Sequence, residues 1–216
     1  MTSSDRFHDA DEVFDMTAAN PCPVQFSISE MFHGHTLVKV DFGEKSDEFC
    51  VANYLDSDFF DLLEVLFWMN PDLYREGLEP LRTAQRKSYV FKSESNSYWL
   101  YWNLEGSDVY LTLRPVGTMP DGNIELKIER DDEMWIQTIV PYKALCYTVV
   151  KAVNDLMAKQ GFLGICWSNE SKDLNLRHFL HLKAIAMDMG PIDDCDGFTS
   201  YSKLEDDLKL VALPMP

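Results

Sequence analysis

The sequence predicts an α+β fold, in which an antiparallel meander sheet and an N-terminal hairpin carry helices packed on one face. Five runs between residues 87 and 140 alternate apolar and polar side chains and are joined by short links. Two further alternating runs precede them at 21–42, and segments with apolar residues at helical spacing lie at 58–70 and beyond 140. Strands and helices in such separate blocks are typical of α+β proteins.

The first elements are a hairpin, a third strand and a helix. Alternation over 21–42, with His33, Gly34 and His35 at the turn, predicts the hairpin, and residues 48–55 predict the next strand. Asp56 or Ser57 caps a helix over 58–70. Apolar residues recur on one side of that helix: Phe59, Leu62, Leu63, Leu66 and Phe67.

The meander is predicted from five strand-like runs, at 87–94, 97–105, 108–116, 123–131 and 133–140. Val109, Leu111 and Leu113 share one side of their strand, while Tyr110, Thr112 and Arg114 share the other. One face of the sheet is therefore expected to be buried, and the other to be wet or covered only in part.

The C-terminal half is predicted to be mainly helical. A long helix begins at Pro141 and stops at Gly161, and the apolar run 162–167 follows as a strand or an extended link. A second helix is expected over 173–189 and a short one over 204–210. The chain then divides into a flexible acidic arm (1–20), a single α+β domain (21–190) and an acidic C-terminal tail (191–216).

The charge is unevenly distributed along the chain. Of 36 acids and 19 bases, residues 1–80 hold 17 acids and 4 bases, and residues 191–216 hold 6 acids and 2 bases. The net charge of −17 therefore lies at the two ends, around a balanced middle. Such a surface disfavours nucleic acid and anionic membranes as partners and favours a basic protein.

The expected location is the cytoplasm. The N-terminus has neither the basic start nor the apolar run of a signal peptide, and the most apolar stretch is about half of a membrane span. The five cysteines are scattered and odd in number, which suits reduced thiols.

Catalytic, cofactor and metal signatures are missing from the sequence, so we expect a protein that is not an enzyme, with no cofactor and no metal. A calcium loop set on Gly197 puts Ile192 at its first ligand position and Lys203 at its last, so neither position holds an acid. His178 and His181 lie three residues apart on a helix, but surface or capping roles are favoured over metal binding. Cys146 and Cys166 lie in apolar surroundings typical of unreactive thiols.

Ten residues are predicted to bind a partner. Eight acids surround the third strand and the first helix, and two aromatic residues share one side of the run 97–105. The set comprises Asp41, Glu44, Asp47, Glu48, Asp56, Asp58, Asp61, Glu64, Trp99 and Tyr101. Asp61 and Glu64 are expected on the side of the helix away from its apolar residues, where like charges favour a basic partner. Structural packing is the favoured interpretation of Trp99 and Tyr101, with a pocket or a partner surface left open.

In acidity and in the order of hairpin, "DSDFFDLLEVLFWMN" helix, meander and long helix, the chain resembles acidic immunity proteins of bacterial polymorphic-toxin systems. The resemblance implies a non-enzymatic protein that binds and neutralises a cognate toxin, a nuclease being one candidate. Two alternatives stay open. One is an enzyme or small-ligand binder with a pocket at the aromatic sheet face, and the other is an inhibitor that imitates the charge of nucleic acid.

Overall fold

The computed structural model describes residues 22–32, 35–52, 59–73, 89–92, 97–104, 107–168, 174–189, 194–196, 199–201 and 204–215. Within these ranges the chain has the predicted α+β fold, built on two main antiparallel sheets. The arm predicted at 1–20 lies outside the described residues, and so do His33, Asp56 and Asp58.

The N-terminal sheet has three strands in chain order, which confirms the predicted hairpin and third strand. They are β1 (Val24–Phe32), β2 (His35–Phe42) and β3 (Lys45–Ala52). Alternate residues point into the core, where Val38 of β2 lies opposite Phe49 of β3. The other side of each strand carries the polar residues, as the period of two requires.

The larger sheet is the predicted five-stranded meander. Its strands are β4 (Tyr89–Lys92), β5 (Ser97–Leu104), β6 (Ser107–Val116), β7 (Asn123–Arg130) and β8 (Glu133–Pro141). Leu100, Leu111, Leu126 and Ile136 are buried on one face. The prediction of one buried face is therefore confirmed, and the opposite face is called the outer face below.

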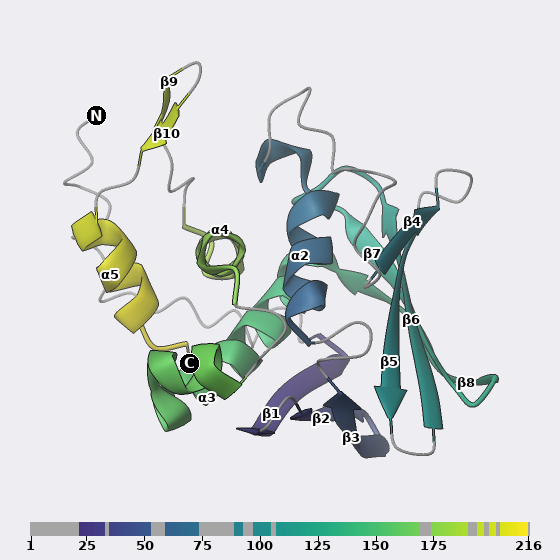
Figure 1. Ribbon diagram of the computed structural model, residues 1–216. Helices are drawn as coiled ribbons and strands as arrows, with labels where there is room; N and C mark the ends of the chain where they lie inside the picture. Colours follow the sequence, from purple (N-terminus) through teal and green to yellow (C-terminus); the bar gives the residue numbers. More distant parts are fainter. Residues whose placement is uncertain are drawn as a thin grey trace.

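Four helices pack on the buried side, as Figure 1 shows to the left of β5 and β6. They are α2 (Phe59–Met69), α3 (Tyr142–Ser168), α4 (Leu176–Ala186) and α5 (Leu204–Ala212). A 3₁₀ turn, η2 (Pro71–Leu73), follows α2, and β9 (Asp194–Asp196) pairs with β10 (Thr199–Tyr201). α2 contacts β5 and α4, and α5 contacts α4, so α5 lies farthest from the sheet.

The run 162–167 is helical, which corrects the prediction of a strand or an extended link. Gly161 interrupts α3 with φ 75° and ψ 158°, and the helix then resumes as far as Ser168. Glycine ends the first part as predicted, because it adopts a positive φ without a steric penalty. A short apolar run has no periodicity that separates a buried strand from a helix.

Side chains of β3, β7 and β8 join the two main sheets. The Lys45 Nζ donates a hydrogen bond to the Trp135 carbonyl at 2.6 Å, and the Phe49 and Trp135 rings meet edge to face at 5.4 Å. Arg130 of β7 pairs with Asp47 and lies over the Phe49 ring, 5.8 Å from its centre. β3 contacts β5 directly, so the two sheets share one core, and α2 packs beside β5 (Figure 1).

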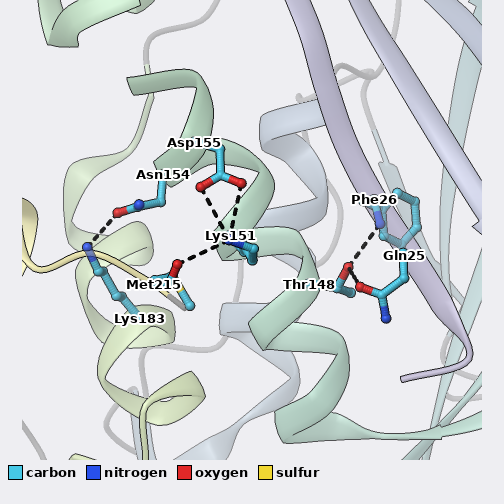
Figure 2. Close-up of polar contacts among 8 residues, drawn as sticks. All are labelled: Gln25, Phe26, Thr148, Lys151, Asn154, Asp155, Lys183 and Met215. Atoms are coloured by element: carbon cyan, nitrogen blue, oxygen red, sulfur yellow. Dashed lines mark hydrogen bonds and ion pairs between the residues drawn. The ribbon is translucent and has the colours of Figure 1, made fainter. Parts of the chain in front are cut away.

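The outer edge of β1 is covered by α3. Figure 2 shows the Thr148 hydroxyl of α3 accepting the Phe26 N–H at 2.9 Å and donating to the Gln25 Oε1 at 3.2 Å. Farther along, the Lys159 Nζ donates to the Ser29 carbonyl at 2.7 Å. An edge strand whose backbone groups are occupied in this way is protected from pairing with another chain.

Two lysines hold the C-terminal segment against the helices (Figure 2). Lys183 of α4 is fully buried, and its ammonium donates to the Asn154 Oδ1 at 2.6 Å, the Val211 carbonyl at 3.2 Å and the Leu213 carbonyl at 2.6 Å. The Lys151 Nζ donates to the Met215 carbonyl at 3.1 Å. The carbonyls that α5 leaves unsatisfied at its C-terminus therefore find donors in this contact.

We expect Lys183 to make stability depend on pH in a defined direction. Burial lowers its pKa to about 8 from the usual 10.5. The folded chain therefore binds this proton more weakly than the unfolded chain, and the contribution of Lys183 to the free energy of unfolding increases as the pH rises between these values. Burial raises the pKa of the Cys22 thiol to about 11, and it also raises the pKa of Cys146. The contribution of these thiols to the free energy of unfolding therefore decreases as the pH rises.

Comparison of the wild type with Lys183→Met isolates the contribution of the lysine, because both chains carry the same thiols. Urea denaturation across this pH range gives the free energy of unfolding of each chain. The wild-type value minus the Lys183→Met value should increase with pH. A difference that decreases with pH contradicts the lowered pKa.

Candidate functional site

The outer face of the five-stranded sheet carries large apolar side chains that reach solvent. Three rows cross this face in register: Tyr101, Tyr110, Glu129 and Met134; Trp99, Thr112, Lys127 and Gln137; and Arg114, Glu125 and Ile139. Trp99, Tyr110, Met134 and Ile139 are between 36% and 62% exposed. Exposed apolar side chains gathered on one face are typical of a binding surface.

Two tyrosines form the centre of the first row. The rings of Tyr101 and Tyr110, directly opposite each other on β5 and β6, are stacked with their centres 4.9 Å apart. The Tyr101 hydroxyl donates a hydrogen bond to the Asp108 Oδ1 at 2.7 Å. Ring stacking and this hydrogen bond fix the orientation of the pair on the sheet.

The turn between β7 and β8 brings more acids to the same end of the sheet. The Asp131 N–H donates to the Asp108 carbonyl at 2.9 Å, and the Asp108 N–H donates to the Asp131 Oδ1 at 3.1 Å. Asp131 and Asp132 have φ of 51° and 64°, a region that aspartate tolerates better than most residues. We call Tyr101, Asp108, Tyr110, Glu129, Asp131 and Met134 together the acidic tyrosine patch.

The basic side chains near the patch are paired with acids of the same chain. The Arg114 Nε donates to the Glu125 Oε2 at 2.7 Å, and the Lys127 Nζ lies 3.5 Å from the Glu125 Oε1. The Arg114 guanidinium lowers the pKa of Glu125, which keeps this carboxyl ionised. Arg130 is half-buried and pairs with Asp47, and its Nε also lies 3.6 Å from the Asp131 Oδ2. Asp108 and Glu129 therefore supply most of the negative potential that the acidic tyrosine patch presents to a cation approaching from solvent.

The acids predicted on β2 and β3 lie on a different sheet from this patch. Asp41 and Glu48 are on the solvent side, Asp41 paired with Lys39 at 3.0 Å and Glu48 accepting from the Ser29 hydroxyl at 3.1 Å. A hydrogen bond from Ser46 and the Lys39 ammonium lower the pKa of Asp41. Glu44 is exposed in the turn between the strands, and Asp47 pairs with Arg130. Two of these four acids are therefore neutralised by bases of the same chain.

Asp61 corrects the prediction of a solvated acidic face on the first helix. It is only 4% exposed, because nine of the eleven residues of α2 are buried. A helix that is apolar on nearly every side is packed on every side, so an acid within it is buried as well. Glu64 is half-buried, with its Oε1 3.4 Å from the Trp68 Nε1. Neither residue belongs to an open acidic surface on this helix.

The two predicted aromatic residues lie together on the outer face. Trp99 is 39% exposed and Tyr101 is half-buried, while Tyr98, Leu100 and Trp102 of the same strand are buried. Trp99 therefore reaches solvent, unlike the residues on the other side of β5. The acids that surround the tyrosine pair were not among the predicted residues: Asp108, Glu129 and Asp131.

Two histidines and a cysteine that the sequence analysis singled out are buried in the structure: His178, His181 and Cys146. His178 and His181 are 6% and 7% exposed, and the His178 ring stacks on Phe67 with the centres 4.1 Å apart. The expectation of surface or capping roles is therefore wrong, because α4 packs this side against α2. The fully buried Cys146 has a raised pKa, as its predicted unreactive environment requires. Among the described residues, no three His, Cys, Asp or Glu side chains gather to hold a metal ion.

Comparisons of this chain with protein-family models, with curated proteins and with solved structures each returned no match. Within the described residues, no helix has both the length and the apolar composition that crossing a bilayer requires. Inferences about function therefore depend on the geometry of the outer face and on the charge of the chain.

Proposed function

We propose that this chain is a non-enzymatic binding protein that acts in the cytoplasm on a basic protein and neutralises it by covering its cationic surface. The observation that carries the proposal is the acidic tyrosine patch on the open face of the five-stranded sheet. Aromatic side chains supply contact area at low cost in conformational entropy, and carboxylates supply complementary charge. Immunity proteins that mask a cognate toxin are the class that this proposal favours.

Charge supports the proposal at longer range. The net charge of −17 raises the rate at which a cationic protein meets the chain, whatever face it meets first. The described cysteines Cys22, Cys50 and Cys146 form no disulfide, which suits a reducing compartment.

Affinity capture from the native host tests this function. The bait is the wild-type chain, a patch variant carrying Tyr110→Leu and Glu129→Gln, or a control variant carrying Leu208→Ala and Glu205→Gln. The control likewise changes one large side chain and neutralises one acid, both exposed on α5. We expect a basic protein to be retained by the wild type and the control, lost with the patch variant, and released as salt is raised.

A second step separates neutralisation from simple binding. The captured protein is expressed in a test strain alone, with the wild-type chain or with the patch variant. We expect growth inhibition that the wild-type chain relieves and the patch variant does not. Capture of no basic protein, or equal capture by the wild type and the patch variant, contradicts the proposed function.

A further inference from the structure

We propose that the acidic tyrosine patch recognises arginine in preference to lysine, on an extended segment of the basic partner. This inference rests on the proposed function and adds the chemistry of the group that is recognised. It is carried by the placement of a stacked tyrosine pair between carboxylates from two strands and a turn.

Two carboxylates, those of Glu129 and Asp108, lie close enough to the tyrosine rings to contact a cation that stacks on them. Glu129 lies directly opposite Tyr110 on the neighbouring strand, so their Cβ atoms are about 5 Å apart on the same face. Asp108 accepts the Tyr101 hydroxyl through its Oδ1. A carboxylate has about four lone-pair sites on two oxygens, so Asp108 keeps capacity to accept further donors. A guanidinium against Tyr110 can therefore contact a ring and a carboxylate together.

Chemistry then distinguishes arginine from lysine at such a site. The guanidinium is planar, loses its hydration more readily than an ammonium, stacks on aromatic faces and donates to a carboxylate through two parallel N–H groups. An ammonium gains nearly the same long-range attraction from the acids, but not the stacking. The acids alone set affinity for any cation, and the tyrosine pair adds the preference for arginine.

The molecule already contains this combination where its two main sheets meet. Arg130 lies over the Phe49 ring, 5.8 Å from its centre, and pairs with Asp47. A ring on one strand and a carboxylate two residues away thus hold an arginine between the two sheets. The acidic tyrosine patch offers the same pair of groups to solvent.

Register indicates why the recognised segment is extended. Trp99 and Tyr101 lie two residues apart on one face of β5, which separates them by about 6.6 Å, the spacing of alternate side chains in an extended peptide. Lys127 lies in the row of Trp99 and repels a second cation there. We therefore place the arginine at the tyrosine end and an uncharged side chain at Trp99.

Two repeat peptides of equal length and charge, one of alternating Gly and Arg and one of alternating Gly and Lys, test the inference by calorimetric titration of the full chain at low salt. We expect the Gly-Arg peptide to bind about three- to ten-fold more tightly than the Gly-Lys peptide. Tyr110→Leu should remove this preference for the Gly-Arg peptide. Glu129→Gln should lower the affinity of the chain for both peptides by the same factor. The control variant, which carries Leu208→Ala and Glu205→Gln, should bind both peptides as the wild type does.

Three results would overturn the inference: equal affinity of the wild type for the two peptides, the same preference in Tyr110→Leu, or no binding of either peptide. None of them bears on whether affinity capture finds a basic protein, so failure of this inference is distinct from failure of the proposed function. Circular dichroism of each variant confirms that it is folded, which the exposure of Tyr110 and Leu208 leads us to expect.

Discussion

Replacement of Lys183 by alanine should release the C-terminal segment and lower the free energy of unfolding by about 3 kcal/mol. The ammonium satisfies the carbonyls of Val211 and Leu213 and the side chain of Asn154, and its stem fills space in the core. Alanine leaves these acceptors without a donor and opens a cavity. Hydrogen exchange should show faster exchange at the amides of α5 than in the wild type, and urea denaturation gives the loss of stability.

Two further variants separate the charge of Lys183 from its packing. Lys183→Met keeps an apolar stem of similar length, so it should release α5 with a smaller loss of stability than Lys183→Ala. Lys209→Ala removes an exposed lysine of α5 that pairs with Glu205 at 2.9 Å, and should leave the free energy of unfolding almost unchanged. Unchanged exchange in α5 of Lys183→Ala would show that other contacts hold the segment.

Thr148→Val should cost about 2 kcal/mol, because it leaves the Phe26 N–H without its acceptor at a buried position. Valine has nearly the same shape as threonine, so the change removes the hydroxyl without opening a large cavity. The Gln25 side chain also loses its donor. Urea denaturation measures the loss, and hydrogen exchange should locate it at β1, whose edge α3 covers.

Thr148→Ser is the matched control, because it removes a methyl group and keeps the hydroxyl. It should cost less than Thr148→Val, about 1 kcal/mol for one buried methyl group. If serine destabilises the chain as much as valine does, packing of the methyl group stabilises this contact and the hydrogen bond to Phe26 does not.

Elements with a clear period were predictable from the sequence. Alternation placed β6 and β7 correctly because one side of each strand is buried and the other is wet, as Leu111 and Thr112 illustrate. The residues after Gly161 were not predictable, because glycine interrupts α3 for one residue without ending it. Burial of Asp61 was missed because the apolar stripe of α2 was taken for one side of a helix that is packed almost all round.

The candidate site was predictable only in part. Sequence composition directed attention to the acidic ends of the chain, whereas Asp108, Glu129 and Asp131 lie in the balanced middle. Net charge over a segment hides a local cluster when bases of that segment pair with other acids, as Arg114 and Lys127 pair with Glu125. The signal available was the run "ERDDE" at 129–133, which the meander prediction already placed at the end of a strand, beside the turn that precedes Tyr110.

The hydrogen bond between Phe26 and Thr148 joins residues 122 positions apart. A ribosome adds about 5–20 residues per second, so on the order of ten seconds pass between the synthesis of β1 and that of the helix that covers its edge. During that interval the nascent N-terminal sheet exposes a strand able to pair with other chains. Production of this protein should consequently depend on chaperones that hold the nascent chain until residue 160 has emerged.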